Sequence, residues 1–250
     1  MKNRAWISEI FSSVQGEGPL AGERHLFVRF CGCHRSCAFC DTPTQRTEQA
    51  ELTLRDGTRR SLQNPFTPHQ LFEALVQLDE DRIHTMISIT GGAPLLQIKF
   101  MEELLPLLKG SGRKIYLETT GDLPEALDRV IAELDWISMD IKLPSVTLEA
   151  PQWQAHLNFL TRCVNRSDVR FFIKVVVSAH TEEDDLRILG EQVRQTAPRA
   201  LLVLQPLTPS EKMKAVPTPE QLLAWQEMLL RMGVAEVRVI PQMHIQLNML

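Results

Sequence analysis

The sequence predicts an α/β fold, a partial (β/α) barrel of about six βα units. Short apolar segments typical of buried strands alternate with amphipathic segments typical of helices. Nearly continuous apolar strands indicate a parallel sheet that is covered on both faces. The chain has 250 residues, of which 44% are hydrophobic and 23% charged, so it can bury a large core. We expect a single domain over residues 1–250.

The elements follow one another in a regular alternation. The predicted strands are His25–Phe30, Thr85–Thr90, Lys114–Glu118, Trp136–Ile141, Phe171–Val177, Leu201–Gln205 and Val237–Ile240. The predicted helices are Pro68–Leu78, Leu95–Leu108, Pro124–Leu134, Leu148–Arg162, Glu182–Gln195 and Pro219–Met232. The pairs Thr67-Pro68, Thr181-Glu182 and Thr218-Pro219 are typical of an N-cap followed by a first helical turn.

The polar segment 44–66 interrupts this alternation. Its Asp56-Gly57 pair lies between Glu51–Leu54 and Thr58–Leu62 and predicts a β-hairpin. We expect this insertion to take the place of the helix that would otherwise follow the first strand.

Charge and hydropathy exclude several classes of protein. The formal net charge of −4 gives no broad basic surface for nucleic acid. The first residues are not followed by the apolar stretch of a signal peptide, and no segment has the length of a membrane span. We therefore expect a cytoplasmic enzyme that binds neither nucleic acid nor membrane, in a reducing compartment that keeps cysteines free.

Three cysteines form the motif that points to chemistry. Cys33, Cys37 and Cys40 are spaced as C-x₃-C-x₂-C, one ligand fewer than the four of a closed zinc site or an ordinary iron–sulfur site. A 4Fe–4S cluster held by three cysteines leaves one iron open to another ligand. The alternative is a four-thiolate zinc site that includes Cys31, whereas Cys163 is expected in the core.

This spacing resembles the signature of the radical SAM superfamily, in which the open iron binds the amino and carboxylate groups of SAM. Phe39, directly before the last cysteine, is also typical of that superfamily. The resemblance implies that the partial barrel is of the radical SAM type, with a 4Fe–4S cluster and SAM (S-adenosylmethionine) as cofactors.

Two further features indicate a ligand site. Gly16 and Gly18 allow the backbone to approach a ligand closely, and Gln15 offers both a donor and an acceptor, although an ordinary turn would have the same composition. Arg29 lies within an apolar strand, and a guanidinium in such a place needs an anionic partner. A ligand carboxylate would suit its fork, and an internal ion pair with Glu118 is the alternative.

Taken together, the motifs resemble the 7-carboxy-7-deazaguanine synthase family along essentially the whole chain. The matching motifs are Val14-Gln15-Gly16-Glu17-Gly18, Arg29, the cysteine triad with Asp41-Thr42, Thr90-Gly91-Gly92, Glu118-Thr119-Thr120-Gly121, Leu204-Gln205-Pro206-Leu207 and Gln242-Met243-His244. The resemblance implies a lyase that converts 6-carboxy-5,6,7,8-tetrahydropterin to 7-carboxy-7-deazaguanine with loss of ammonia, in queuosine and 7-deazapurine biosynthesis.

The resemblance also implies roles for individual residues. Val14, Gln15, Gly16, Arg29 and Thr90 would bind the substrate. Phe39, Cys40, Asp41, Gly92, Ser138, Asp140 and Lys142 would bind SAM, although Lys142 could also be an exposed loop cation. Thr42 would bind Mg²⁺, and the tail with His244 would close over the substrate. A homodimer and a one-electron donor such as flavodoxin are implied as well.

One position departs from the family pattern. The usual G-G-E-P motif here has Ala93 in place of glutamate, which removes a polar anchor for the SAM amino group.

Lys174, within an apolar strand, is either a contact inside the barrel or a neutralised core lysine. Three alternative functions stay open at this point: a glycyl-radical activase with the same cysteine spacing, a zinc-binding module without catalysis, and a family member that has lost turnover.

Overall fold

The computed structural model describes residues 3–40, 42 and 45–249, and within them ten strands form one sheet. The strands are β1 Ile7–Val14, β2 Arg24–Phe30, β3 Gln49–Thr53, β4 Arg59–Gln63, β5 Met86–Gly91, β6 Ile115–Thr119, β7 Trp136–Asp140, β8 Arg170–Val177, β9 Leu201–Pro206 and β10 Glu236–Val239. Their order across the sheet is β10-β9-β8-β7-β6-β5-β2-β1-β3-β4.

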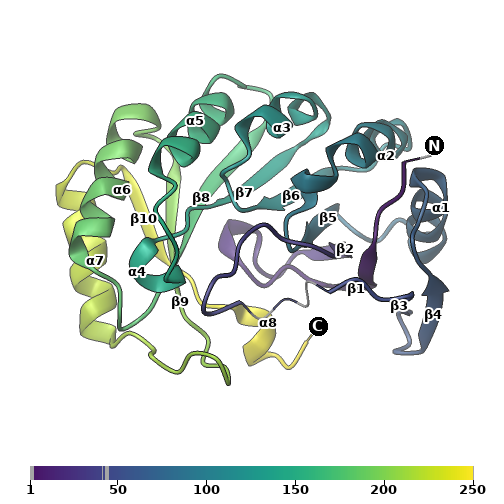
Figure 1. The fold of residues 1–250 in the computed structure, drawn as a ribbon, viewed down its shortest axis with the longest axis horizontal. Helices are drawn as coiled ribbons and strands as arrows, with labels where there is room; N and C mark the ends of the chain where they lie inside the picture. Colours follow the sequence, from purple (N-terminus) through teal and green to yellow (C-terminus); the bar gives the residue numbers. More distant parts are fainter. Residues whose placement is uncertain (1–2, 41, 43–44, 250) are drawn as a thin grey trace.

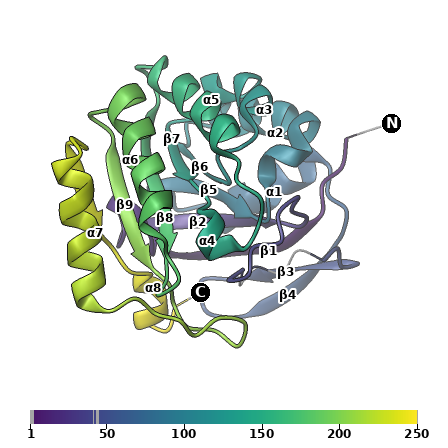
Figure 2. The same ribbon diagram turned by 60° about the vertical axis from the view of Figure 1, so that its left-hand side comes forward.

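Seven neighbouring strands, β2, β5, β6, β7, β8, β9 and β10, are parallel and confirm the predicted partial barrel. The helices are α1 Pro68–Leu78, α2 Ile98–Gly110, α3 Pro124–Asp128, α4 Pro144–Thr147, α5 Trp153–Val164, α6 Glu183–Thr196, α7 Pro219–Arg231 and α8 Met243–Gln246. The longer helices lie along the outer side of the curved sheet, and α8 lies at its open side beside the C-terminus (Figures 1 and 2). In the described chain, at least one of these helices follows each of six strands before the next parallel strand begins. The six strands are β2, β5, β6, β7, β8 and β9.

The first strand was not predicted. β1 runs antiparallel to β2, and a register shift between Ile7 and Glu9 interrupts the pairing. Such an irregularity breaks the alternation of apolar and polar residues by which a strand is found in a sequence. β1 also pairs with the hairpin β3–β4, which confirms the hairpin predicted around Asp56-Gly57. The hairpin does not replace a helix, because α1 follows it before β5.

Two helix predictions need correction. The segment from Leu148 is not helical until Trp153: Leu148 has a φ of 61°, in the left-handed region, and Pro151 disfavours helix at the residue before it. The segment predicted as one helix over Pro124–Leu134 is divided into α3 and a short 3₁₀ turn, Ile131–Glu133.

The capping predictions are confirmed at two of three places. Thr67 and Thr218 each accept a hydrogen bond from the backbone of the third helical residue and complete a capping box, in α1 and α7. At α6 the N-cap is Glu182, and the Thr181 hydroxyl instead accepts a hydrogen bond from the Ser178 backbone at 2.9 Å.

The buried apolar residues form two clusters. The larger cluster fills the space between the sheet and the outer helices. A smaller cluster joins Leu20, from the 3₁₀ turn Gly18–Leu20, to four strand residues, Met86, Tyr116, Phe172 and Val203. Among the described residues no helix is long and apolar enough to cross a membrane.

Candidate active site

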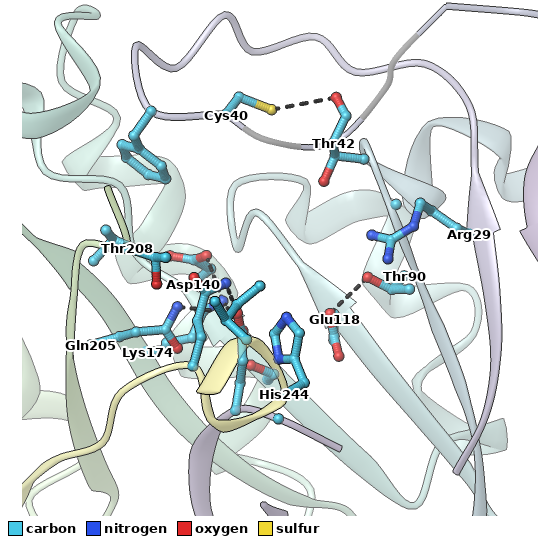
Figure 3. A pocket seen from close by; sticks show the side chains of 18 of the residues that line it. Arg29, Cys40, Thr42, Thr90, Glu118, Asp140, Lys174, Gln205, Thr208 and His244 are labelled. Atoms are coloured by element: carbon cyan, nitrogen blue, oxygen red, sulfur yellow. Dashed lines mark hydrogen bonds and ion pairs between the residues drawn. The ribbon is translucent and has the colours of Figure 1, made fainter. Parts of the chain in front are cut away.

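A pocket of about 680 Å³ opens within the curved sheet, at the carboxyl ends of the parallel strands. Such strand ends are where barrel enzymes place their active sites. The pocket brings together nearly all the predicted site residues, which come from distant parts of the chain (Figure 3). Those that line it are Val14, Gln15, Gly16, Arg29, Cys33, Cys37, Phe39, Cys40, Thr42, Thr90, Gly92, Ser138, Asp140 and Lys142. Asp41, the other predicted SAM ligand, lies outside the described residues.

The three motif cysteines are free, half-buried and turned toward this one pocket. Burial raises the pKa of the Cys37 thiol to about 11 and also raises the pKa of Cys33. A metal centre would displace these protons, because the thiolate is the ligand. In the described part of the chain, no group of three His, Cys, Asp or Glu side chains is arranged to hold a single metal ion. The donor set suits a cluster, whose cysteines bind different irons and so stand farther apart than ligands of one ion.

Cys31 does not join the triad. It is only 3% exposed and does not line the pocket. Burial raises the pKa of its thiol, and the charges that act on it come from Arg46 and Glu9. The charges near Cys33 and Cys37 instead include Lys142. The structure thus gives no support to a zinc site built from all four cysteines.

Arg29 points into the pocket, but its protein partner differs from the one considered from the sequence (Figure 3). Its Nε lies 3.0 Å from Oε2 of Glu9, on the neighbouring strand β1, and its guanidinium lies 5.7 Å from the centre of the Phe11 ring. The alternative pairing with Glu118 is therefore wrong. Glu118 accepts hydrogen bonds from Gln15 Nε2 at 3.0 Å and from Thr90 Oγ1 at 2.7 Å.

A buried ion pair crosses the barrel interior. Lys174 Nζ lies 2.5 Å from Oε2 of Glu17 and 3.2 Å from Oδ2 of Asp140. Oε1 of Glu17 accepts hydrogen bonds from the side-chain amides of Gln205, at 3.1 Å, and Gln242, at 2.8 Å. This geometry supports the reading of Lys174 as a contact inside the barrel.

The charged side chains around this ion pair shift one another's pKa values. Burial alone raises the pKa of Glu17, but the Lys174 ammonium and the surrounding donors outweigh it and lower the pKa to about 2. Burial lowers the pKa of Lys174, yet Asp140 and Glu17 raise it well above its usual value. Burial, together with the charge of Glu17, raises the pKa of the Glu118 carboxyl. The pocket therefore holds carboxylates of unlike proton affinity.

Lys142 is not an exposed loop cation, because its side chain is only 12% exposed. Its Nζ lies 2.8 Å from Oδ2 of Asp140 and 5.1 Å from the centre of the Phe39 ring. These contacts join the end of β7 to the cysteine loop.

The glycines after β5 permit a close backbone approach. A Cβ on Gly92 would lie 2.1 Å from the Gly32 carbonyl oxygen, so only glycine fits there. Ala93 follows with its backbone N–H bonded to the same oxygen at 2.9 Å. Its side chain is 2% exposed and does not line the pocket. Ala93 therefore offers no polar side-chain group to the pocket, as its departure from the family pattern implies.

The C-terminal tail lies against the loop between β1 and β2, residues 15–23, which is the N-terminal loop of the pocket. Met243 N donates to the Gly16 carbonyl oxygen at 2.8 Å, and His244 packs so closely on Gly16 that a Cβ there would lie 1.8 Å from Nδ1 of the ring. His244 also lines the pocket (Figure 3).

Three further residues line the pocket that the sequence did not single out individually: Glu9, Gln205 and Thr208. Gln205 does belong to a motif that matches the family.

Glu17→Gln tests the buried ion pair through acid stability. The pKa of Glu17 falls from an ordinary value of 4.5 to about 2 in the folded chain. A lowered pKa stabilises the fold fully above 4.5, and this contribution is lost as the pH falls toward 2. We expect up to roughly 3 kcal/mol of wild-type stability to depend on this ionisation. Denaturant unfolding at pH 5, 4 and 3 should show a shallower loss for the variant.

The exposed carboxylate Glu125, 82% accessible, provides the matched control as Glu125→Gln. This variant should follow the wild-type pH dependence. Parallel curves for Glu17→Gln and wild type would contradict the role given to the ion pair.

Comparison with known proteins shows the family of the chain. Residues 27–175 match the family model described as the radical SAM superfamily. The chain is 38% identical over 249 residues to a 7-carboxy-7-deazaguanine synthase of Geobacter sulfurreducens, covering 97% of both chains. It is 35% identical over 262 residues to the enzyme of that name from Methanothermobacter thermautotrophicus, covering 98% of both. Among solved structures, QueE from Escherichia coli superposes with a TM-score of 0.57 at 19% identity, covering 96% of this chain and 95% of that one.

Proposed function

The chain belongs to the 7-carboxy-7-deazaguanine synthase family of the radical SAM superfamily, and from that premise we propose how its pocket performs the family reaction. It is a radical SAM lyase of the queuosine pathway, which converts 6-carboxy-5,6,7,8-tetrahydropterin to 7-carboxy-7-deazaguanine and releases ammonia. Relatives that match over nearly the whole chain favour this function over a glycyl-radical activase or a zinc-binding module. The observation that carries the proposal is the single pocket shared by the cysteine triad and Arg29.

The cofactors of this superfamily are a 4Fe–4S cluster and SAM. Bound together, they supply the one-electron chemistry that removes a hydrogen atom from an unreactive carbon. Cys33, Cys37 and Cys40 would hold the cluster. SAM would contact Phe39, Cys40, Asp41, Gly92, Ser138, Asp140 and Lys142. The 2.8 Å pair of Asp140 and Lys142 supports this assignment, since it presents both signs of charge to a zwitterionic ligand.

The substrate would lie between the SAM site and the N-terminal loop. Arg29 would bind the pterin carboxylate, because a guanidinium can donate two parallel hydrogen bonds to it. Val14, Gln15, Gly16 and Thr90 would line the pterin ring. The hydrogen bonds from Gln15 and Thr90 hold the Glu118 carboxylate in a fixed place beside this position. These residues orient the substrate, and none is assigned as a general base.

Thr42 would place its hydroxyl on a Mg²⁺ near the pterin carboxylate. Thr42 lines the pocket, on the same side as Cys40 (Figure 3). Mg²⁺ keeps several waters and takes only a few oxygen ligands from protein and substrate, so a single hydroxyl is compatible with it. Removing Mg²⁺ would then weaken substrate binding more than SAM binding.

Closure of the pocket keeps water away from reactive species. The tail supports this role, because Gln242 and Met243 bond to the N-terminal loop at Glu17 and Gly16. We further propose a single domain that works as a homodimer. A one-electron donor such as flavodoxin would reduce the cluster in the cytoplasm, where the cysteines stay free.

Anaerobic reconstitution with iron and sulfide tests the function. The protein should bind about four irons, as a cluster requires. After reduction, it should form 7-carboxy-7-deazaguanine from 6-carboxytetrahydropterin and SAM. A colourless protein with one zinc would refute it. A loaded protein that cleaves SAM but forms no product would indicate a member of the family that has lost turnover.

A further inference from the structure

The loop that carries the cysteines is braced by a buried arginine of its own. Arg35 lies between Cys33 and Cys37, lines the pocket, and has a side chain only 6% exposed. Its guanidinium pairs with two carboxylates that are distant in the sequence. Nε lies 2.9 Å from Oε2 of Glu149, and NH1 lies 3.4 Å from Oδ2 of Asp122.

Glu149 touches the cysteine loop at three consecutive residues. Besides Arg35, its Oε1 accepts a hydrogen bond from Ser36 N at 2.6 Å, and its Oε2 lies 3.6 Å from Cys37 Sγ. The preceding Leu148 has a φ of 61°, in the left-handed region that a leucine rarely adopts. Strain of this kind persists only where the surrounding contacts enforce it, and here those contacts hold a carboxylate beside a metal ligand.

Arg35 also has donor capacity that the protein leaves unused. Its NH2 and Nε atoms are buried and make no hydrogen bond among the described residues, although Nε is within ion-pair distance of Glu149. Asp122 is already engaged by His34 Nε2 at 3.0 Å and by Thr120 Oγ1 at 2.5 Å. A buried N–H without a partner is costly, so a group that accepts from it would be favoured in this position.

Resting on the proposed function, we propose that Arg35 and Glu149 set the reduction potential of the cluster in opposite directions. Reduction adds one negative charge to the cluster and its thiolates. A nearby cation or N–H donor to sulfur favours the reduced state, and a nearby carboxylate disfavours it. Arg35 therefore raises the potential and Glu149 lowers it. Both residues act through the cluster and are not catalytic residues.

The test compares two variants that each remove one charge in the reconstituted full-length protein. Glu149→Gln keeps an acceptor for Ser36 but loses the charge, and Arg35→Gln loses the cation. EPR-monitored redox titration should show a potential higher than wild type for Glu149→Gln and lower for Arg35→Gln. We expect about a tenfold change each way in the reduced-to-oxidised ratio at a fixed potential, equivalent to about 59 mV for one electron.

Two controls separate charge from structure. Arg35→Lys retains the cation and should stay closer to wild type than Arg35→Gln. The exposed pair of Arg129 and Glu102, 2.5 Å apart between α2 and the residue after α3, provides Glu102→Gln, which should not change the potential.

Several results would overturn the inference. Unchanged potentials, or shifts of both neutral variants in one direction, would show that the two charges do not set the potential. If only one of the two variants binds the cluster, a shift of its potential in the expected direction supports the inference, and no shift or the opposite shift refutes it. If neither binds it, the contacts are a structural brace only. A wild-type protein without a 4Fe–4S signal would instead refute the proposed function.

Discussion

Arg29→Lys is expected to lower the turnover of 6-carboxytetrahydropterin by on the order of 10²-fold, because a small misplacement of the reacting carbon has a cost of that size. An ammonium cannot reproduce the two parallel hydrogen bonds of the guanidinium to a carboxylate. The cluster and SAM binding should persist, since the described side-chain contacts of Arg29 are to Glu9 and Phe11 and not to the cysteines. The measurement is product formation under anaerobic reduction, beside iron content and melting temperature.

Arg24→Lys is the matched control for this change. Arg24 lies on the same strand, is exposed, and donates to the Ser12 hydroxyl at 3.0 Å. It should keep normal turnover. A stable, cluster-loaded Arg29→Lys protein with normal turnover would remove Arg29 from the substrate site. Loss of fold and cluster together would instead mean that its pairing with Glu9 is structural.

Alanine at Cys33, Cys37 or Cys40 is expected to abolish both cluster content and SAM cleavage. A cluster that has only three protein thiolates cannot lose one and stay bound in a defined position. All three cysteines line the pocket, and each contributes one free thiol. Iron and sulfide analysis after reconstitution, together with an assay of SAM cleavage, would measure the effect.

Cys31→Ala and Cys163→Ala are the controls, because both residues are buried in the core, 3% and 1% exposed, and do not line the pocket. They should retain cluster and activity, with a loss of stability at most. If Cys31→Ala lost the cluster while Cys33→Ala kept it, the ligand assignment would be wrong.

The sequence alone determined the features that depend on short stretches of chain. Continuous apolar strands alternating with amphipathic helices predicted the parallel partial barrel, because each pattern reports the burial of its own segment. The cysteine spacing predicted a three-thiolate site for the same reason, since its ligands are near neighbours in the chain. Asp56-Gly57 located the hairpin through local turn chemistry.

Only the tertiary structure decided which distant side chains meet. Arg29 pairs with Glu9 because a strand with an irregular register, invisible to periodicity, lies beside β2. Ala93 is buried and its backbone N–H is bonded to the Gly32 carbonyl oxygen, a contact that the spacing of residues does not predict. Arg35 meets Glu149 across 114 positions, after a left-handed Leu148 that no helical pattern predicts. Contacts between residues so far apart in the sequence depend on strand order and on backbone angles. The spacing of residues along the chain predicts neither of them.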